Sequence, residues 1–483
     1  MFAPADWLAA SARRVPEREA LRVLGRSYTY AELDREASAM ASSLWKQGVR
    51  EGDRVATLLP NGVTSAIIPH AALRLGATLV PLNTRLAPAE IEWQLEHCQP
   101  RLVISSADQL QIPRFARDDR GDARDDRGDA RDDRGDRGDA RDHEPAPDHP
   151  LAIIYTSGTT GRPRGAVLTV ANFAASAKAS AANLGVRDDD RWLAVLPLFH
   201  VGGLSILLRS AMQGTCAVVH ERFDAAAVNH AIDHERITIV SLVAVLIQRL
   251  LDDRGERPFP PSLRAVLAGG GPVPPALLER SARAGLPVVQ TYGLTEATSQ
   301  VATLAPADAL SRLGSAGRPL EGTEVRIHGG AEGEILVRGP TVMQGYFRDP
   351  EATRRAMADG WLHTGDVGRL DDAGYLYVLD RRDDLIVTGG ENVYPAEVEG
   401  VLEAHPSVEE AAVIGAPDAT WGQRVVAVVR LRPGASASVD ALTAWCRERL
   451  AGYKVPRVTR IVDAPLPRTA SGKLQRSLLR DFQ

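Results

Sequence analysis

The chain has 483 residues, more than one compact core usually accommodates, so at least two domains are expected. Hydrophobic residues make up 44% and charged residues 25%, as in ordinary globular proteins, and the net charge of −5 argues against a nucleic-acid-binding protein. No apolar run reaches the roughly 18 residues that a membrane span needs.

The location of the protein is predicted from its cysteines and its first residues. Cys98, Cys216 and Cys446 lie far apart and form no metal-ligand spacing, so we expect them to be reduced and buried in a cytoplasmic protein. In the first 19 residues, arginines follow a short apolar stretch, and no signal peptide is expected.

The first hundred residues alternate between predicted helices and buried strands. Apolar side chains recur at helical spacing at Ala37, Met40, Ala41, Leu44 and Trp45. A short apolar strand at 54–59 follows, then a helix through 71–75 and a second strand at 79–82. This order predicts βαβ units in a mostly parallel sheet, and the same order returns from residue 150 to about residue 300.

Residues 117–142 interrupt this pattern with a repeat of Arg-Asp-Asp-Arg-Gly-Asp-Ala. A coiled coil is excluded because no hydrophobic residues occupy the positions that would form its seam. Such a segment cannot bury enough apolar surface to offset its ordering entropy, so we predict a disordered surface insertion.

Beyond residue 310 the pattern changes to short alternating strands, at 333–338 and 374–379, which predict a small antiparallel β subdomain. The charged stretch 380–384 is a predicted linker. Pro395 opens a helix, 424–431 form a strand, and a second helix carries Leu442, Trp445 and Cys446.

The predicted fold class is therefore α/β. A large N-terminal domain, residues 1–382, holds two βα-layered sheets and the small β subdomain, and a small α+β domain occupies residues 383–483.

The strongest chemical signal lies at residues 153–165, where an apolar strand runs into hydroxyls and glycines. Glycines let successive backbone N–H groups point at one place, and threonine and serine add hydroxyl donors, which together suit a phosphate. The segment is not a Walker A loop, because no Gly-Lys-Ser/Thr follows at the required spacing. By composition alone, a simple turn between strands remains the alternative.

The order of residues in this segment resembles the phosphate loop of the adenylate-forming superfamily, which includes acyl-CoA synthetases, luciferases and the adenylation domains of peptide synthetases. Other motifs of that superfamily follow in the same order at 269–272, 291–296, 360–366, 380–384, 389–392 and 467–473. The likeness spans nearly the whole chain apart from about residues 110–148. It implies that ATP activates a carboxylic acid as an acyl-adenylate, whose acyl group then passes to a thiol.

The resemblance implies which residues bind ATP and magnesium. Glu296 matches the Mg²⁺ ligand, and carboxylate oxygens suit that ion. The phosphates would be held by Thr156, Ser157, Gly158, Thr159, Thr160 and Arg164. The nucleoside would be held by Gly269, Gly270, Gly271, Tyr292, Gly293, Thr295, Asp366 and Arg381. Many members have Lys in place of Arg164, so this phosphate contact is expected to differ, because Arg is a planar fork.

The remaining implied roles concern catalysis and movement. Lys473 would stabilise the charge that builds up during adenylation, so Thr156, His200, Glu296 and Lys473 are the expected catalytic residues. The C-terminal domain of the superfamily swings between two orientations, with Asp383 at the hinge position. Gly389 and Gly390 match a loop that lines a tunnel for the pantetheine arm of coenzyme A (CoA), and His200 matches a residue that borders the acyl site.

Three functions compete: a CoA ligase, an enzyme that loads a carrier protein, and a degenerate binding protein without activity. The third is disfavoured because the matched residues are present, and the lack of a fused carrier domain favours CoA over a carrier. The expected partners are ATP, Mg²⁺, CoA and a carboxylic acid, with no nucleic acid and no membrane insertion, and a homodimer is compatible with the sequence.

Within the superfamily, residues 197–209, 269–274, 291–300 and 313–319 resemble the 2-succinylbenzoate–CoA ligases of menaquinone synthesis more than long-chain ligases. That acid has a second carboxylate, which needs donors or a cation. Ser299, Gln300 and Arg209 are candidates, against the alternatives of ordinary loop polarity for the first two and a helix-surface cation for Arg209. Benzoate-type and medium-chain acids remain alternative substrates.

Overall fold

The computed structural model describes residues 6–106, 145–156, 163–271, 273–309, 311–380, 385–467, 476 and 478–479. The predicted insertion at 117–142, the phosphate-loop residues 157–160, Arg381, Asp383 and Lys473 lie outside the described residues.

A six-stranded sheet in the order β17-β7-β6-β4-β3-β5 forms one layer of the large N-terminal region. Its strands are β3 (Arg54–Thr57), β4 (Thr78–Pro81), β5 (Leu102–Ile104), β6 (Pro150–Thr156), β7 (Arg164–Thr169) and β17 (Gly345–Tyr346). The pairs among β6, β4, β3 and β5 are parallel, whereas β7 and β17 add an antiparallel edge. The parallel βαβ prediction is confirmed, with the first strand two residues shorter than expected.

A nine-stranded sheet in the order β14-β13-β12-β11-β10-β8-β9-β1-β2 forms the other layer. Its strands are β1 (Glu19–Val23), β2 (Arg26–Thr29), β8 (Arg191–Ala194), β9 (Cys216–Val219), β10 (Ile239–Leu242), β11 (Ala265–Ala268), β12 (Val288–Tyr292), β13 (Ala302–Thr303) and β14 (Arg318–Pro319). The six central strands are parallel, and the antiparallel strands lie at the two ends.

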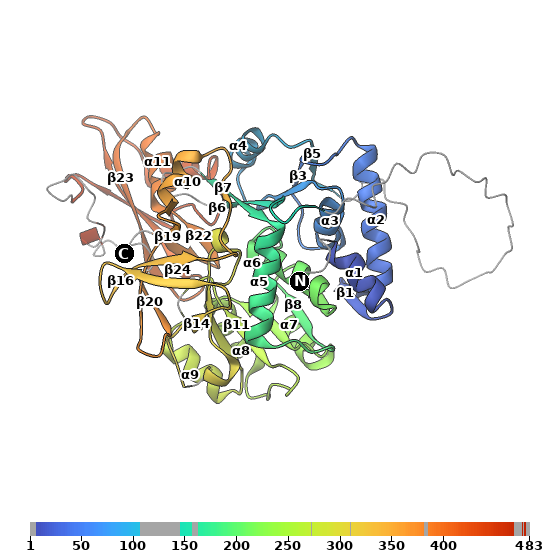
Figure 1. The fold of residues 1–483 in the computed structure, drawn as a ribbon. Coiled ribbons are helices and arrows are strands. Elements are labelled where there is room, and N and C mark those ends of the chain that lie inside the picture. Colours follow the sequence, from blue (N-terminus) through green and yellow to red (C-terminus); the bar gives the residue numbers. More distant parts are fainter. Residues whose placement is uncertain are drawn as a thin grey trace.

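Helices cover both sheets and supply the core. They are α1 (Trp7–Arg14), α2 (Tyr30–Lys46), α3 (Val63–Arg74), α4 (Pro88–Cys98), α5 (Val170–Leu184), α6 (Val201–Gln213), α7 (Ala225–His234), α8 (Ala244–Arg254) and α9 (Pro275–Arg283). One cluster of buried side chains joins α2, α3, α5 and α6 to both sheets, and α5 and α6 stand in the centre of the molecule (Figure 1). The predicted amphipathic helix is α2, and Trp45 lies at the border of its apolar face, 40% exposed, with the Arg50 guanidinium covering its ring.

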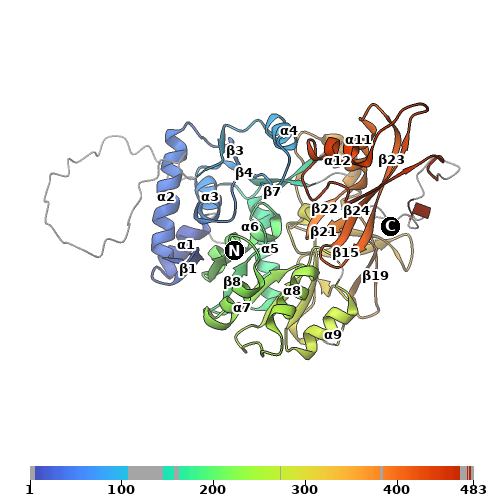
Figure 2. The ribbon, with the colours of Figure 1, turned by 180° about the vertical axis from the view of Figure 1, so that it is seen from behind.

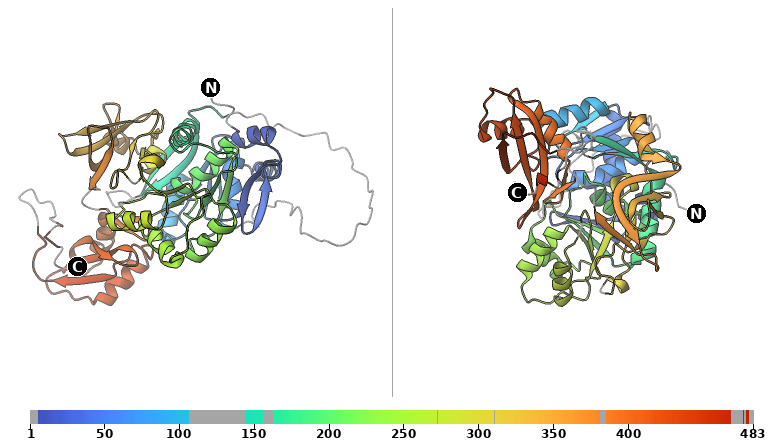
Figure 3. Two further views of the ribbon diagram at one scale, coloured as in Figure 1. Left: turned by 90° about the horizontal axis from the view of Figure 1, so that it is seen from below. Right: turned by 90° about the vertical axis from the view of Figure 1, so that its left-hand side faces the viewer.

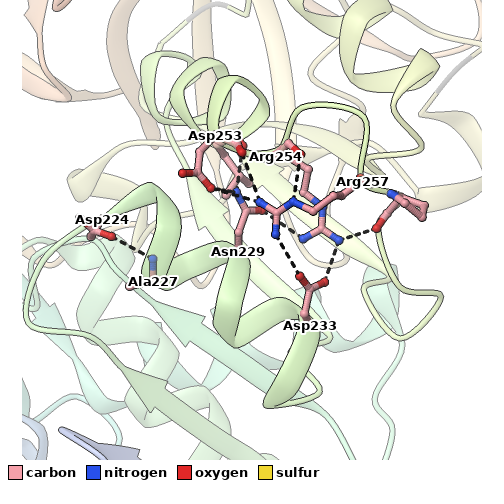
Figure 4. A network of polar contacts seen from close by, with 9 residues as sticks. Asp224, Ala227, Asn229, Asp233, Asp253, Arg254 and Arg257 are labelled. Atoms are coloured by element: carbon pink, nitrogen blue, oxygen red, sulfur yellow. Dashed lines mark hydrogen bonds and ion pairs between the residues drawn. The ribbon is translucent and has the colours of Figure 1, made fainter.

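A buried arginine ties α7 to α8. Arg254, at the end of α8, donates to Asn229 on α7 at 3.2 Å and to Asp233 at 2.7 Å (Figure 4). Because Arg254 is buried, these contacts compensate its desolvation and fix the two helices against the nine-stranded sheet.

A third, antiparallel sheet confirms the small β subdomain. It consists of β15 (Glu324–His328), β16 (Gly333–Arg338), β18 (Met357–Ala358), β19 (Trp361–Leu370) and β20 (Leu376–Asp380), and α10 (Pro350–Ala356) precedes β18. Figure 3 shows this sheet and the C-terminal part as separate lobes on one side of the central body.

The C-terminal part, residues 385–467, is an α+β unit with its own core. Its strands are β21 (Ile386–Thr388), β22 (Glu391–Val393), β23 (Val408–Asp418), β24 (Gly422–Leu431) and β25 (Val458–Val462), and its helices are α11 (Pro395–Glu403) and α12 (Val439–Arg447). Val398, Leu402, Leu442 and Cys446 are buried together, as the helical spacing predicted. Helix α4 lies near α11 and α12 in Figure 2, and Glu90 on α4 accepts from Lys454 and from the Ala451 N–H of the C-terminal part. The α/β fold class is confirmed, whereas the boundary at residue 383 stays a prediction.

Candidate active site

A cavity of about 1280 Å³ lies between the N-terminal sheets and the C-terminal part. It is lined by segments that follow parallel strands at their carboxyl ends, where open α/β sheets bind ligands. Most predicted residues within the described part line it: Thr156, Arg164, His200, Arg209, Gly269, Gly270, Gly293, Thr295, Glu296, Ser299, Gln300, Asp366, Gly389 and Gly390. Gly271 and Tyr292 are not among the lining residues.

Glu296 lies on a short 3-10 helix, Thr295–Ala297, that follows β12. The Tyr346 hydroxyl donates to its Oε1 at 2.8 Å, and the Arg164 guanidinium lies 5.5 Å from the Tyr346 ring. Burial, and then the neighbouring Glu296 carboxylate, raise the pKa of Tyr346, so the phenol stays a donor. Within the described ranges, no three His, Cys, Asp or Glu side chains gather as a metal cage. A single oriented carboxylate nevertheless fits Mg²⁺, which takes one or two carboxylates together with substrate phosphates.

Asp366 also lines the cavity and is held directly by Tyr292 and, through the turn before it, by Glu334. The Tyr292 hydroxyl donates to Asp366 Oδ2 at 2.7 Å. Glu334 Oε1 accepts from the Gly365 N–H at 2.9 Å and its Oε2 lies 2.9 Å from His363 Nδ1, so Glu334 fixes the turn that carries Asp366. The predicted contact of Tyr292 with adenine stays a prediction.

The wall that follows Glu296 has a strained backbone. Thr298 and Ser299 have φ values of 51° and 86°, left-handed conformations that cost residues other than glycine about 1–3 kcal/mol. Two hydrogen bonds and one close backbone crossing fix this segment. Thr298 donates to the Thr341 carbonyl at 2.7 Å, Ser176 donates to the Thr298 carbonyl at 2.8 Å, and a Cβ at Gly293 would lie 1.5 Å from the Ser299 carbonyl oxygen. Only glycine at 293 permits this close crossing.

Arg209 is buried on the same side of the cavity. Its Nη2 donates to Ser176 Oγ at 3.4 Å, and its guanidinium lies 4.9 Å from the Trp192 ring. Among the described residues, no carboxylate forms an ion pair with Arg209 and its Nε has no hydrogen-bond partner. Burial lowers the pKa of the guanidinium to about 10. The alternative of a helix-surface cation is therefore wrong, and within the described ranges the positive charge of Arg209 at the cavity has no counterion.

The C-terminal part closes the cavity near His200. Glu391 Oε2 lies 3.2 Å from His200 Nε2, and Glu391 Oε1 accepts from Arg85 at 2.8 Å. Burial alone would raise the pKa of the Glu391 carboxyl, but His200, Arg85 and Lys454 outweigh it and lower this pKa. A Cβ at Gly389 would lie 2.7 Å from the Trp421 ring, so this loop packs closely against Trp421 at the cavity wall only without a side chain.

Sequence analysis missed several of these residues. Glu391 lies inside the motif at 389–392 but was given no role, and Tyr346 follows a glycine in an ordinary short strand. Arg85 and Lys454 have no local signal, because Arg85 pairs with Glu391 and Lys454 with Glu90, each more than 300 residues away along the chain.

Comparison with known proteins agrees with this site. The AMP-binding enzyme family matches residues 8–347, and the AMP-binding enzyme C-terminal domain matches residues 397–473. The chain therefore belongs to the AMP-binding enzyme family. Among its relatives is the 2-succinylbenzoate–CoA ligase of Geobacillus kaustophilus, 45% identical, with 98% of this chain and 97% of the relative covered. The ligase of the same name from Bacillus licheniformis is 43% identical, covering 98% and 99%.

Solved structures give the same family. A double mutant of o-succinylbenzoate CoA synthetase from Bacillus subtilis, bound with the product analogue OSB-NCoA, superposes with a TM-score of 0.89 at 39% identity, covering 99% of this chain and 98% of that chain. An amide bond synthetase from Marinactinospora thermotolerans superposes at 0.84 with 30% identity, covering 99% of each. The superfamily and fold predicted from the motifs are confirmed.

This chain superposes unequally on two complexes of the Bacillus subtilis enzyme. Its complex with the acyl-adenylate OSB-AMP superposes on this chain with a TM-score of only 0.71 at the same 39% identity and coverage. The C-terminal part makes up about a sixth of this chain. A fall from 0.89 to 0.71 is the loss expected when that part alone is placed differently. This chain therefore adopts the arrangement of the product-analogue complex.

Proposed function

We propose that this chain activates 2-succinylbenzoate with ATP as an acyl-adenylate and then transfers the acyl group to CoA. The observation that carries the choice of acid is the buried Arg209, a cation on the cavity wall that no described carboxylate neutralises. Relatives at 40–45% identity over nearly the whole chain, named 2-succinylbenzoate–CoA ligases, support the same assignment.

The surroundings of Arg209 suit an aromatic ring that carries a carboxylate. Trp192 offers an aromatic face beside the guanidinium, and Ser176 links Arg209 to the segment that leads to Ser299 and Gln300. Gln300 Oε1 is buried with no partner among the described residues. In this assignment Arg209 binds the ring carboxylate of the substrate, with Ser299 and Gln300 beside it. The flexible succinyl chain then extends toward the phosphates of ATP.

In the first half-reaction, an oxygen of the succinyl carboxylate attacks the α-phosphorus and the bond to pyrophosphate breaks. Thr156 and Arg164 would hold the phosphates, Asp366 the ribose hydroxyls, and Gly269 and Gly270 the base edge. Glu296, oriented by Tyr346, would hold Mg²⁺, which supplies positive charge beside the phosphates. Lys473 would stabilise the negative charge that builds up at the reacting carboxylate and α-phosphate.

In the second half-reaction, the CoA sulfur attacks the acyl carbon, the C–O bond to AMP breaks, and the thiol proton leaves to solvent. Gly389, Gly390 and Trp421 border the passage through which a thin pantetheine arm would enter. His200 stands at the acyl end of that passage, and its contact with Glu391 orients the imidazole.

A substrate panel tests the assignment. We expect kcat/KM for 2-succinylbenzoate, measured with CoA, to exceed the values for substituted benzoates and C6 to C12 fatty acids by at least roughly tenfold. A smaller margin rejects this acid and leaves the CoA ligase assignment standing. Pyrophosphate release without thioester formation would reject CoA as the acceptor.

Lys473→Ala separates the two half-reactions. We expect adenylate formation to fall roughly 10² to 10³-fold, because a positioned cation at the developing charge is lost. Thioester formation from supplied acyl-adenylate is expected to stay near the wild-type rate. Equal losses in both steps would contradict the role assigned to Lys473.

We also place the enzyme in the cytoplasm. All three cysteines are buried and free, as in proteins of a reducing compartment. Each described helix falls short of the length and apolarity needed to cross a membrane. A homodimer stays a prediction that sedimentation analysis can test.

A further inference from the structure

A buried polar cluster joins α4 of the N-terminal region to the C-terminal part. This interface cluster consists of Glu90 on α4 and of Lys454 and Glu397 in the C-terminal part. Lys454 Nζ donates to Glu90 Oε1 at 2.5 Å and to Glu397 Oε1 at 2.7 Å. Glu90 Oε2 accepts from the Ala451 N–H, also in the C-terminal part, at 2.8 Å.

The burial of the interface cluster makes these contacts strong. The Lys454 side chain is 2% exposed, Glu397 is 7% exposed and Glu90 is 10% exposed. Burial alone would lower the pKa of Lys454, but Glu397 and Glu90 outweigh it and raise this pKa, so the ammonium stays charged. A charged hydrogen bond removed from water is screened little by salt and depends steeply on position.

The three residues are not equivalent. Lys454 and Glu397 belong to the same part of the chain, so their pair persists wherever that part lies. Glu90 belongs to the N-terminal region and also caps its own helix, because its Oε2 accepts from the Ala87 N–H at 2.8 Å. Within the interface cluster, the contacts that depend on how the C-terminal part is placed are those of Glu90 with Lys454 and with Ala451.

This chain superposes better on the product-analogue complex of the Bacillus subtilis relative than on its acyl-adenylate complex, with TM-scores of 0.89 and 0.71. In the present placement, Gly389, Gly390 and Glu391 of the C-terminal part line the cavity beside His200. The interface cluster therefore forms together with the wall that the second half-reaction needs.

We propose that Glu90 is a positioning residue for thioester formation, acting through Lys454 and the Ala451 amide to hold the C-terminal part in this placement. The inference rests on the two-step reaction proposed above. A ligand or contact that favours one placement changes the rate of the step that needs it by changing the population of that placement.

Glu90→Gln in the full-length enzyme is the direct test. Glutamine keeps an oxygen for the two backbone amides and removes the charge opposite Lys454. Since a charged hydrogen bond shifts an equilibrium by roughly ten- to hundredfold, we expect single-turnover thioester formation from supplied acyl-adenylate and CoA to slow by about tenfold. ATP–pyrophosphate exchange, which follows adenylate formation, is expected to stay within about twofold of wild type.

Two matched controls define the outcome. Glu92→Gln removes an exposed carboxylate from the same helix and is expected to change neither step. Glu397→Gln removes the other carboxylate on Lys454 but leaves the contact between the two parts, so thioester formation is expected not to slow. The inference is overturned if Glu90→Gln leaves the thioester step unchanged, slows both steps equally, or matches Glu397→Gln. If the wild type makes no thioester at all, the proposed function fails instead.

Discussion

Replacing Arg209 by methionine separates what this residue does for substrate from what it does for stability. Methionine is unbranched and fills a similar apolar volume beside Trp192, but it carries no charge. Arg209 is 3% exposed, and its described polar contact is one long hydrogen bond to Ser176. The free enzyme thus keeps in the cavity wall a buried cation that has no carboxylate partner among the described residues.

The size of the stability effect follows from the pKa. Burial lowers the pKa of Arg209 to about 10, which corresponds to about 3 kcal/mol by which the folded state disfavours the charged guanidinium. The contact with Trp192 and the hydrogen bond to Ser176 offset about 1–2 kcal/mol of this burial cost. We therefore expect Arg209→Met to stabilise the ligand-free protein by about 1–2 kcal/mol and to raise its Tm by about 1–3 °C.

The effect on catalysis has the opposite sign and depends on the acid. With 2-succinylbenzoate, loss of a buried charged contact should lower kcat/KM by about 10²-fold. With 3-benzoylpropionate, which is the same acid without its ring carboxylate, the wild type and the variant should differ by less than about threefold. Arg209→Lys keeps a charge without the planar fork and should fall between the two.

Thermal unfolding and a coupled CoA-thioester assay on both acids check these expectations. Equal losses on the two acids would show that Arg209 supports the fold of the cavity and does not bind the ring carboxylate. A variant that melts below the wild type would show that the buried charge is compensated, and the reasoning from its burial would then be wrong.

Three further predictions concern other regions. Burial, and then Arg74, lower the pKa of His70 to about 4. Between about pH 6.5 and pH 4 the unfolded chain therefore binds more protons at His70, and the free energy of unfolding should fall with decreasing pH by up to about 3 kcal/mol. In urea unfolding at several pH values, His70→Gln should remove that slope; an unchanged slope would show that another group titrates. In Tyr346→Phe, the Mg²⁺ concentration that gives half-maximal pyrophosphate exchange should rise roughly tenfold, because Glu296 loses the donor that orients it. An unchanged half-maximal concentration would contradict this. Removal of residues 117–142 should leave kcat within about twofold of wild type, since surface insertions change closure entropy little, and a large loss in a folded variant would give the repeat a working role.

Most helices and strands, and most residues that line the cavity, could be predicted from the sequence, because these predictions depend on the spacing and order of nearby residues. Helical spacing identified the buried face of α2 apart from Trp45, and motif order brought Thr156, Glu296 and Asp366 to one cavity although they lie far apart in the chain. The interface cluster could not be predicted in this way, because Lys454 and Glu90 are 364 residues apart and each alone has the pattern of an exposed charge. Arg209 was ambiguous for a similar reason, since only packing shows that its helix face is covered.

The position of β1 has a consequence for synthesis on the ribosome. β1 pairs in parallel with β9, so that Leu21 lies opposite Ala217, and the strand must wait almost 200 residues for its partner. At the usual 5–20 residues per second, this delay lasts roughly 10–40 s. During that time the β1–β2 hairpin has one side unpaired, and an unpaired strand edge is a template for contact with other chains. The nascent chain is therefore most exposed to aggregation, and most dependent on chaperones, until residue 219 has left the ribosome.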